Sequence, residues 1–485
     1  MNRYLRAIST NFVFFVINTL FFLVMTPISI RVMGADFYGL WSILIAIALF
    51  SNIGALGIES IINKFSAESK QEITDYPNKV LTSGFIIVLI MALTVMFLML
   101  IMRSLIAKNI QTSPDLQMDF SKAIFWIALS LFPQFLTKVT QGYFLSQYEN
   151  KLVRIMDSLS SLLPWIGAVC ITFFEKNLYK VAEWFFLAQM VVFLTYIIIL
   201  RRKVSYHIVF DCSLLRKMIN FSGYMFIEST AISFFQQFDR VIVGFVLGPV
   251  FAGVYSVGTS FALRLSQISG QATEVMIPYA SLKNSLNDHV RLYTVFRKLS
   301  QYVSLIMAGM GGLLVLWMDE LLSLWISPNY AAAYANPFRL LIIAYGLISL
   351  SRPAHQTLTG LGKVKFTSLI YLSSSVAMLA SVYLFSYRFG ILGAACANII
   401  MVLLLVYNLY TYNILAHGIP WKSVLSDLRG GLFIPFVFYG LLLFNQAILF
   451  RLLLSAILGL TFLIDVLKDD WARTRLFHRG KTIVP

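Results

Sequence analysis

The stretch Met-Gly-Ala-Asp-Phe-Tyr-Gly-Leu-Trp-Ser-Ile, residues 33–43, decides the fold because it returns 214 positions later in the chain. The second copy, residues 247–257, reads Leu-Gly-Pro-Val-Phe-Ala-Gly-Val-Tyr-Ser-Val and shares a Gly, a Phe, a second Gly and a Ser at equivalent positions. Each copy lies between two long apolar runs, which predicts a helix, a tight glycine turn and a second helix. The chain is therefore expected to contain two related halves, as secondary transporters commonly do.

Composition predicts an all-α, polytopic membrane protein. Of 485 residues, 59% are hydrophobic and 12% charged, and the mean hydropathy is +0.78. Apolar runs of about 20 residues recur along the chain, each long enough to cross the hydrocarbon as a helix. We predict fourteen transmembrane helices, at residues 8–30, 39–62, 81–102, 123–144, 152–174, 181–200, 221–247, 250–276, 300–326, 337–358, 366–387, 391–415, 432–447 and 452–467.

The repeat predicts two pseudo-symmetric six-helix lobes, residues 1–205 and 206–418, followed by two extra transmembrane helices and a tail in residues 419–485. The side of the membrane that carries both termini has 25 Lys and Arg residues in its loops and tails, and the opposite side has 9. This bias predicts cytoplasmic termini. The net charge of +16 is then a property of membrane topology, and no nucleic-acid partner is expected.

Two neighbouring spans of the predicted set carry polar stripes. In the eighth span the stripe comprises Ser256, Ser260, Arg264, Gln267, Gln271 and Glu274, all within about 40° of one line. In the seventh it comprises Ser222, Ser229, Ser233, Gln236 and Arg240, with Glu228 and Asp239 on its flank. Lipid cannot solvate such faces, so they are expected to line a water-filled cavity or to pack on each other. Asn18 is a polar position of the first span.

Four cations fall well inside the predicted spans, more than two residues from either end, and each has a structural alternative. Lys138 and Arg352 are equivalent in the repeat and lie toward the cytoplasmic ends of their spans, so a cavity role and a side chain reaching the headgroups are both open. Arg240 could form a structural pair with Asp239 or with Glu228 of the same span. Arg264 lies near the midplane, where a guanidinium costs several kcal/mol unless it is solvated or paired, which favours a functional role.

The sequence lacks the patterns of an enzyme. Gly362-Lys363 lacks the upstream Gly that a phosphate-binding loop requires. No His and Glu residues have the spacing of a zinc site, so neither a metal nor another cofactor is expected. The rival class is a membrane enzyme of lipid-linked sugar assembly, such as a polymerase or ligase, but the predicted outer loops are short. A non-transporting scaffold also remains open. Transport coupled to H⁺ or Na⁺ would need a titrating carboxylate, for which Asp239 and Glu228 are the candidates.

Six segments together resemble the polysaccharide-export branch of the multidrug/oligosaccharidyl-lipid/polysaccharide exporter superfamily, which includes the Wzx O-antigen flippases. The resemblance covers about the first 415 residues and rests on Ile30–Trp41, Leu56–Glu59, Phe238–Gly244, Leu247–Val257, Gly360–Lys363 and Phe389–Ala395. It implies two lobes around a cationic cavity in the bacterial inner membrane. It also implies translocation, by alternating access, of an undecaprenyl-diphosphate-linked oligosaccharide of O-antigen, capsule or exopolysaccharide from the cytoplasmic to the outer leaflet.

On this resemblance, the four cations would suit a diphosphate head group. Arg264, Lys138 and Arg352 are predicted to hold it, and Arg240 to receive it toward the outside. The polar side chains expected to line the cavity are Ser233, Gln236, Ser260, Gln267, Gln271 and Asn18. Expected partners are the lipid-linked substrate, the bilayer, and the polysaccharide polymerase and export machinery. Lipid II exporters and drug exporters of the same superfamily are alternatives, ranked lower because the first span lacks deep basic residues and drug exporters use acidic cavities.

Overall fold

The computed structural model describes residues 2–51, 58–59, 61–63, 65–66, 75–110, 112–147, 149–203, 206–219, 237–273, 275–416, 418, 421–444 and 447–459. Within these ranges the chain is helical and contains no β-strand. The fold is all-α, as the sequence predicted. By internal contacts the chain divides into two compact units: residues 1–257 with 371–397, and residues 258–370 with 398–485. The lobe boundaries at 205 and 418 stay a prediction.

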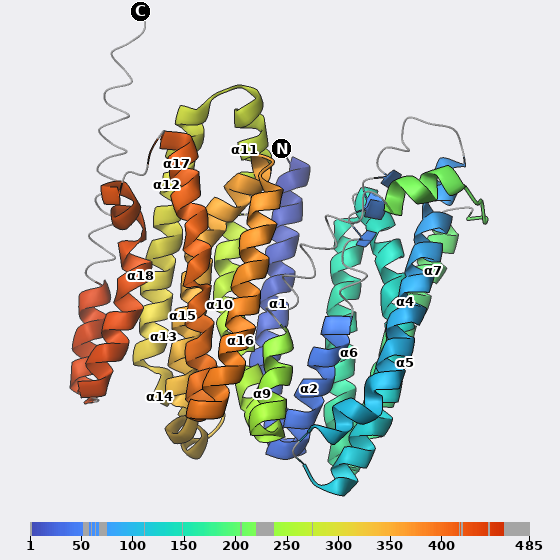
Figure 1. Cartoon of the computed structure of the whole chain (residues 1–485), viewed down its shortest axis with the longest axis horizontal. Helices are drawn as coiled ribbons and strands as arrows, with labels where there is room; N and C mark the ends of the chain where they lie inside the picture. Colours follow the sequence, from blue (N-terminus) through green and yellow to red (C-terminus); the bar gives the residue numbers. More distant parts are fainter. Residues whose placement is uncertain are drawn as a thin grey trace, which may run out of the picture. The chain divides into compact units, whose positions relative to one another are not determined.

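The first unit is built on long helices, of which α4, α5, α6 and α7 run side by side in Figure 1. Helix α5 contacts α2, α4, α6 and α7, and most of its apolar side chains are fully buried, which makes it the centre of this unit. The helices of the unit are α1 (Asn2–Met33), α2 (Ala35–Ser51), α4 (Tyr76–Lys108), α5 (Pro114–Ser146), α6 (Asn150–Phe174), α7 (Leu178–Lys203) and α9 (Asp239–Leu247).

Both repeat turns have the predicted conformation. Helix α1 ends at Met33 and α2 begins at Ala35, and Gly34 between them has φ +79°. In the second copy α9 ends at Leu247, α10 (Pro249–Thr273) begins directly after the turn, and Gly248 has φ +93°. Left-handed backbone conformations are easily reached only by glycine, so the identical Gly fixes the same helix–turn–helix in both copies. The prediction from the repeat is confirmed.

The second unit is organised around α15 (Pro328–Gly360), whose residues 337–351 are almost continuously buried. It packs against α11, α12, α14, α17 and α18. The remaining elements of this unit are α11 (Met276–Ser285), α12 (His289–Ile306), a π-helical turn (Met307–Gly311), α13 (Gly312–Leu316), α14 (Met318–Trp325), a 3₁₀ segment (Asn398–Leu405), α17 (Val406–Ala416), α18 (Trp421–Phe444) and a last helix at Ile448–Gly459. Helix α16 (Val364–Ala397) belongs to the first unit from Tyr371 onward.

Nine helices in the described part of the chain are long and apolar enough to cross a membrane. One of them, Val364–Ala416, is 53 residues long and contains Gly390 at φ +60°, the point where the eleventh and twelfth predicted spans meet. Helix α10 has 25 residues, about 37 Å at 1.5 Å per residue, yet it is too polar to be among the nine. The polytopic membrane fold is thus confirmed, whereas the number of fourteen spans stays a prediction.

Helix α18 is joined to the second unit by a buried carboxylate. Asp427 has a fully buried side chain and accepts two hydrogen bonds from Arg297 of α12, at 2.6 and 2.8 Å. Gln301 and Tyr412 also donate to it, each at 2.6 Å. The sequence alone did not single out Asp427, and this one acidic position specifies the place of the helix.

The last helix is joined by a second ionic cluster. Arg451, 5% exposed, donates to Glu320 at 2.5 Å and to Asp319 at 2.9 Å. Asp319 also accepts from Arg339 of α15, at 2.5 Å. Two guanidinium groups and two carboxylates thus neutralise one another. Removing one partner of such a cluster lowers the stability of the fold strongly, because the remaining groups are left with uncompensated charge.

Candidate functional site

The polar stripe of α10 lies opposite the face by which this helix packs. Gly258, Ser266 and Gly270 lie close to α15, and the small and apolar residues around them are buried. At 100° per residue, the stripe points about 170° away from the centre of that buried face. Its four members in the second unit are all half-buried, neither packed in the core nor fully exposed: Ser260, Arg264, Gln267 and Gln271.

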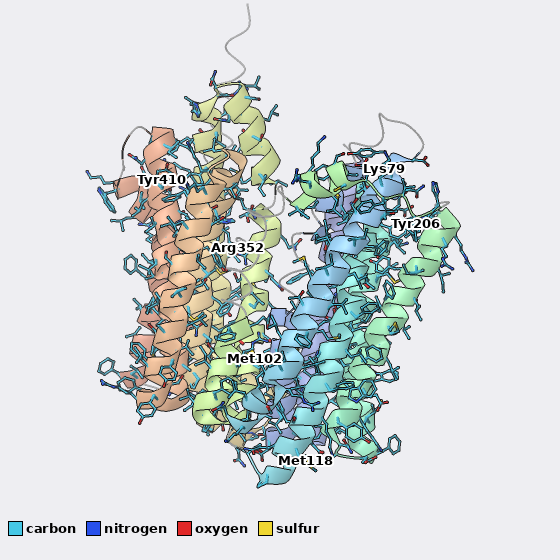
Figure 2. All side chains as sticks on the ribbon, turned by 45° about the vertical axis from the view of Figure 1, so that its right-hand side comes forward. Lys79, Met102, Met118, Tyr206, Arg352 and Tyr410 are labelled. Carbon is cyan, nitrogen blue, oxygen red and sulfur yellow. The ribbon has the colours of Figure 1, made fainter. Side chains whose placement is uncertain are left out.

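Arg352 approaches α10 from the packed side. Its Nε donates to the Ser266 hydroxyl at 3.4 Å, and a Cβ at Gly270 would lie 3.2 Å from one of its terminal nitrogens. Glycine at 270 therefore leaves room for the guanidinium. These contacts are about 140° around α10 from Arg264. Figure 2 places Arg352 well inside the length of its helix bundle rather than at either end.

Lys138 of α5 is held in a charged network of the first unit. Its ammonium lies 3.5 Å from the Glu59 carboxylate and donates to Gln141 Oε1 at 2.7 Å. The Gln141 amide in turn donates to Asp157 at 2.6 Å, and Asp157 lies 3.5 Å from Arg154. Lys138 and Glu59 remain 22% and 31% exposed. Lys138 is thus partly accessible and has a carboxylate beside it.

A close backbone approach positions Glu59. A Cβ at Gly142 of α5 would lie 2.5 Å from the Glu59 carbonyl oxygen, so only glycine allows the two segments to meet there. The sequence did not indicate that Glu59 pairs with Lys138. Both residues lie toward the cytoplasmic ends of their predicted spans and therefore at a similar depth, but nothing in the sequence showed that their helices are neighbours.

Arg240 and Asp239 begin helix α9 and are both buried, at 7% and 0% exposure. Asp239 accepts a hydrogen bond from the Arg240 backbone N–H at 2.7 Å and another from the Tyr255 hydroxyl at 2.9 Å. The hydrogen bonds from these two donors offset part of the cost of burying the carboxylate. The structure therefore gives Asp239 a local role that ties α9 to α10.

The remaining predicted residues divide into two groups. Asn18 of α1 donates to the Ser158 hydroxyl of α6 at 3.1 Å and to the Phe14 carbonyl at 2.8 Å, so it joins two helices. Ser233, Gln236 and Glu228 lie outside the described residues. The sequence also missed Arg339, which is 3% exposed and belongs to the ionic cluster of the last helix.

A family model described as polysaccharide biosynthesis protein matches residues 29–335, more than half of the chain. The chain belongs to the polysaccharide biosynthesis protein family. The matched region includes both repeat turns, Lys138, Arg240 and the α10 stripe, whereas Arg352 lies beyond it. Membership confirms the family that the sequence motifs indicated.

Among the relatives of this family member is the putative O-antigen transporter of Shigella flexneri. It is 23% identical over 390 residues, which cover 79% of this chain and 91% of the relative. Two solved structures have the same fold. An inward-facing multidrug resistance MATE family transporter of the MOP superfamily has a TM-score of 0.70 at 13% identity and covers 82% of this chain and 94% of its own. The lipid II flippase MurJ, in an inward closed conformation, has a TM-score of 0.68 at 13% identity, and the match covers 94% of this chain and 99% of the MurJ chain.

Proposed function

We propose that this protein is a flippase that moves an undecaprenyl-diphosphate-linked oligosaccharide from the cytoplasmic to the outer leaflet by alternating access. The observation that carries the proposal is the α10 stripe: a helix long enough to span the membrane carries half-buried Ser260, Arg264, Gln267 and Gln271 on the face away from α15. Membership in the polysaccharide biosynthesis family and the similarity to an O-antigen transporter support the class of cargo.

The chemistry of the stripe suits an anionic head group. A guanidinium binds two phosphate oxygens at once through a planar fork of donors, and amide and hydroxyl groups supply further donors. Arg264 is the proposed main contact for the diphosphate, with Gln267 and Gln271 beside it on the same face of α10. Arg352 and Lys138 are proposed as further cations of the transport path, and Arg240 as the cation toward the outer side.

Binding of a diphosphate to Lys138 depends on the neighbouring carboxylate of Glu59. Because Glu59 lies 3.5 Å from its ammonium, a diphosphate can bind Lys138 strongly only if it competes with that carboxylate. A cation that exchanges its partner suits a transporter, since tight binding without release would stop turnover. For coupling to H⁺ or Na⁺ we keep Asp239 and Glu228 as the proposed carboxylates, and a transport rate independent of pH and sodium would count against both.

A second proposal concerns orientation and partners. We place both termini in the cytoplasm of a bacterial cell, from the excess of Lys and Arg on that side. The translocated units would then reach a polymerase and export machinery at the outer face. Transport of lipid II or of drugs is the alternative within the same fold, and an enzyme of lipid-linked sugar assembly is the alternative outside it.

The decisive experiment follows the lipid-linked intermediate in cells that lack the chain. Loss of a flippase should trap complete lipid-linked units in the cytoplasmic leaflet, whereas loss of a polymerase should leave single units displayed outside. In complementation, Arg264→Ala should abolish surface polysaccharide at normal protein level, and Arg264→Lys should restore part of it. The matched control is Arg388→Ala, at an exposed position. Full surface polysaccharide with Arg264→Ala would refute the assignment.

A further inference from the structure

Residues 206–219, which follow α7, are fixed to the N-terminal end of α4. The Thr82 hydroxyl contacts the Tyr206 hydroxyl at 3.2 Å and accepts from the Val209 backbone N–H at 3.2 Å. Lys79 pairs with Asp211 at 3.2 Å. Asn78 hydrogen bonds with the ring of His207 at 3.0 Å, and Phe85 packs edge-on against Tyr206. Figure 2 shows Lys79 and Tyr206 together at one end of the unit, with Met118 at the other. The segment has a defined position.

The length of α4 sets the depth of this segment. Lipid-facing side chains such as Ile90, Phe97 and Met102 are 48–63% exposed, and Arg103 directly after them marks one edge of the hydrocarbon. About 20 residues cross 30 Å, so the other edge falls near Thr82. Asn78 and Lys79 then lie within about 6 Å outside it. Residues 206–219, bound to these side chains, therefore lie at the level of the lipid headgroups.

Exposed side chains in and just before this segment are both apolar and basic. Ile208 is 81% exposed, Phe210 62% and Ile219 48%. Arg216 and Lys217 are exposed beside Ile219, and Arg201 and Arg202 are exposed at the end of α7. Large apolar side chains at the headgroup level reach the acyl boundary at little cost, while neighbouring cations attract anionic lipid. Asp211, the acid of the segment, is engaged by Lys79 and Ser213.

We propose that residues 201–203 and 206–219 form a binding surface for anionic phospholipid headgroups. Phe210 and Ile208 enter the boundary of the acyl chains, and Arg201, Arg202, Arg216 and Lys217 bind the phosphates. The surface shares no residue with the α10 stripe, and its role differs from the transport role proposed above. It would fix one end of α4 and α7 at the membrane surface, on the side predicted to be cytoplasmic.

The test measures lipid binding to the purified full chain by native mass spectrometry, with phosphatidylglycerol and phosphatidylcholine as probes. Each basic residue near a charged surface contributes to binding, so Arg216→Gln/Lys217→Gln should bind phosphatidylglycerol about 10- to 30-fold more weakly. The matched control is Lys363→Gln/Lys365→Gln, two exposed lysines on the same predicted side. Equal losses in the two double variants, or equal affinity of the wild type for both lipids, would overturn the proposal.

A depth measurement tests the apolar part independently. A nitroxide is attached through Phe210→Cys in a background where Cys170, Cys212 and Cys396 are Ser, and its accessibility to oxygen and to a water-soluble quencher is compared. We expect the label to report the boundary between headgroups and acyl chains. A label at Asn287→Cys, in an exposed turn, is the aqueous reference. If position 210 is as accessible to the water-soluble quencher as position 287, the segment does not enter the membrane.

Discussion

Gly39 and Gly253, equivalent positions of the two repeat copies, pack directly against each other. A Cβ on Gly253 would lie 3.1 Å from the Gly39 Cα, and a Cβ on Gly39 would lie 1.8 Å from the Pro249 carbonyl oxygen. The two copies therefore do more than resemble each other. Their glycines let α2 and the start of α10 approach to backbone contact, which places the beginning of the helix that carries Arg264.

Gly39→Ala should destabilise the protein strongly, because a methyl group 1.8 Å from a carbonyl oxygen forces the backbones apart. We expect a loss of about 2–4 kcal/mol, seen as a lower thermal midpoint in detergent. Gly346→Ala in α15 is the matched control, since a Cβ there meets nothing within 4 Å. It should be neutral or slightly stabilising. Equal midpoints for the two variants would contradict the close packing.

Asp427→Asn should weaken the attachment of α18 to the second unit. The change leaves Arg297, 32% exposed, without its carboxylate partner, which should cost about 2–4 kcal/mol after allowance for that exposure. Thermal unfolding of the purified chain measures the loss. Asp119→Asn removes the acid of an exposed pair with Lys122 at 4.0 Å and should change stability by less than about 0.5 kcal/mol. A matching small effect at Asp427 would show that the buried pair contributes little.

A charge exchange between Lys138 and Glu59 separates a structural role from a transport role. If Lys138 only pairs with Glu59, the double variant Lys138→Glu/Glu59→Lys should restore surface polysaccharide that Lys138→Glu abolishes. If Lys138 also meets the diphosphate, the exchange should restore protein level and thermal stability but leave export low. Our proposal expects the second result. Export at the wild-type level in the exchanged variant would remove Lys138 from the transport path.

The hairpin of α11 and α12 should loosen in acid. The Asp288 carboxylate accepts from Lys283 at 2.9 Å and caps α12 through the Arg291 backbone N–H at 3.2 Å. The hydrogen bond from Lys283 holds the pKa of Asp288 below its usual value. Because the pKa is lower in the folded state, this stabilisation is complete above about pH 4 and is lost as the pH falls through the folded value.

Pepsin cleavage near residues 283–291 measures this effect. In the wild type, cleavage relative to that of Asp288→Asn should increase as the pH falls from about 4 to about 2, where protonation of Asp288 releases Lys283 and the helix cap. Asp288→Asn should already be cleaved faster at the upper end of this range and should show a flatter pH dependence. A wild-type profile identical to that of Asp288→Asn would show that the carboxylate does not hold the hairpin.

Part of the proposed transport site could be read from the sequence because it depends on a single helix. The stripe of Ser260, Arg264, Gln267 and Gln271 follows from the helical period alone, and the structure finds all four half-buried on one face. The sequence did not indicate that Arg352 meets α10 about 140° from Arg264. It also did not indicate that Asp239 accepts from Tyr255. Each of these needs the position of a second helix or of a second turn.

The sequence by itself determined the class of the protein and its repeat. Hydrophobic length decides membrane insertion, and the glycines at 34 and 248 fix the turns because only glycine adopts their backbone angles at little cost. The tertiary structure alone decided which charges meet: Lys138 with Glu59, and Arg297 with Asp427, 130 residues apart. The reason is physical. Periodicity tells in which direction a side chain leaves its own helix, whereas an ion pair depends on the distance to another helix, which is set by packing.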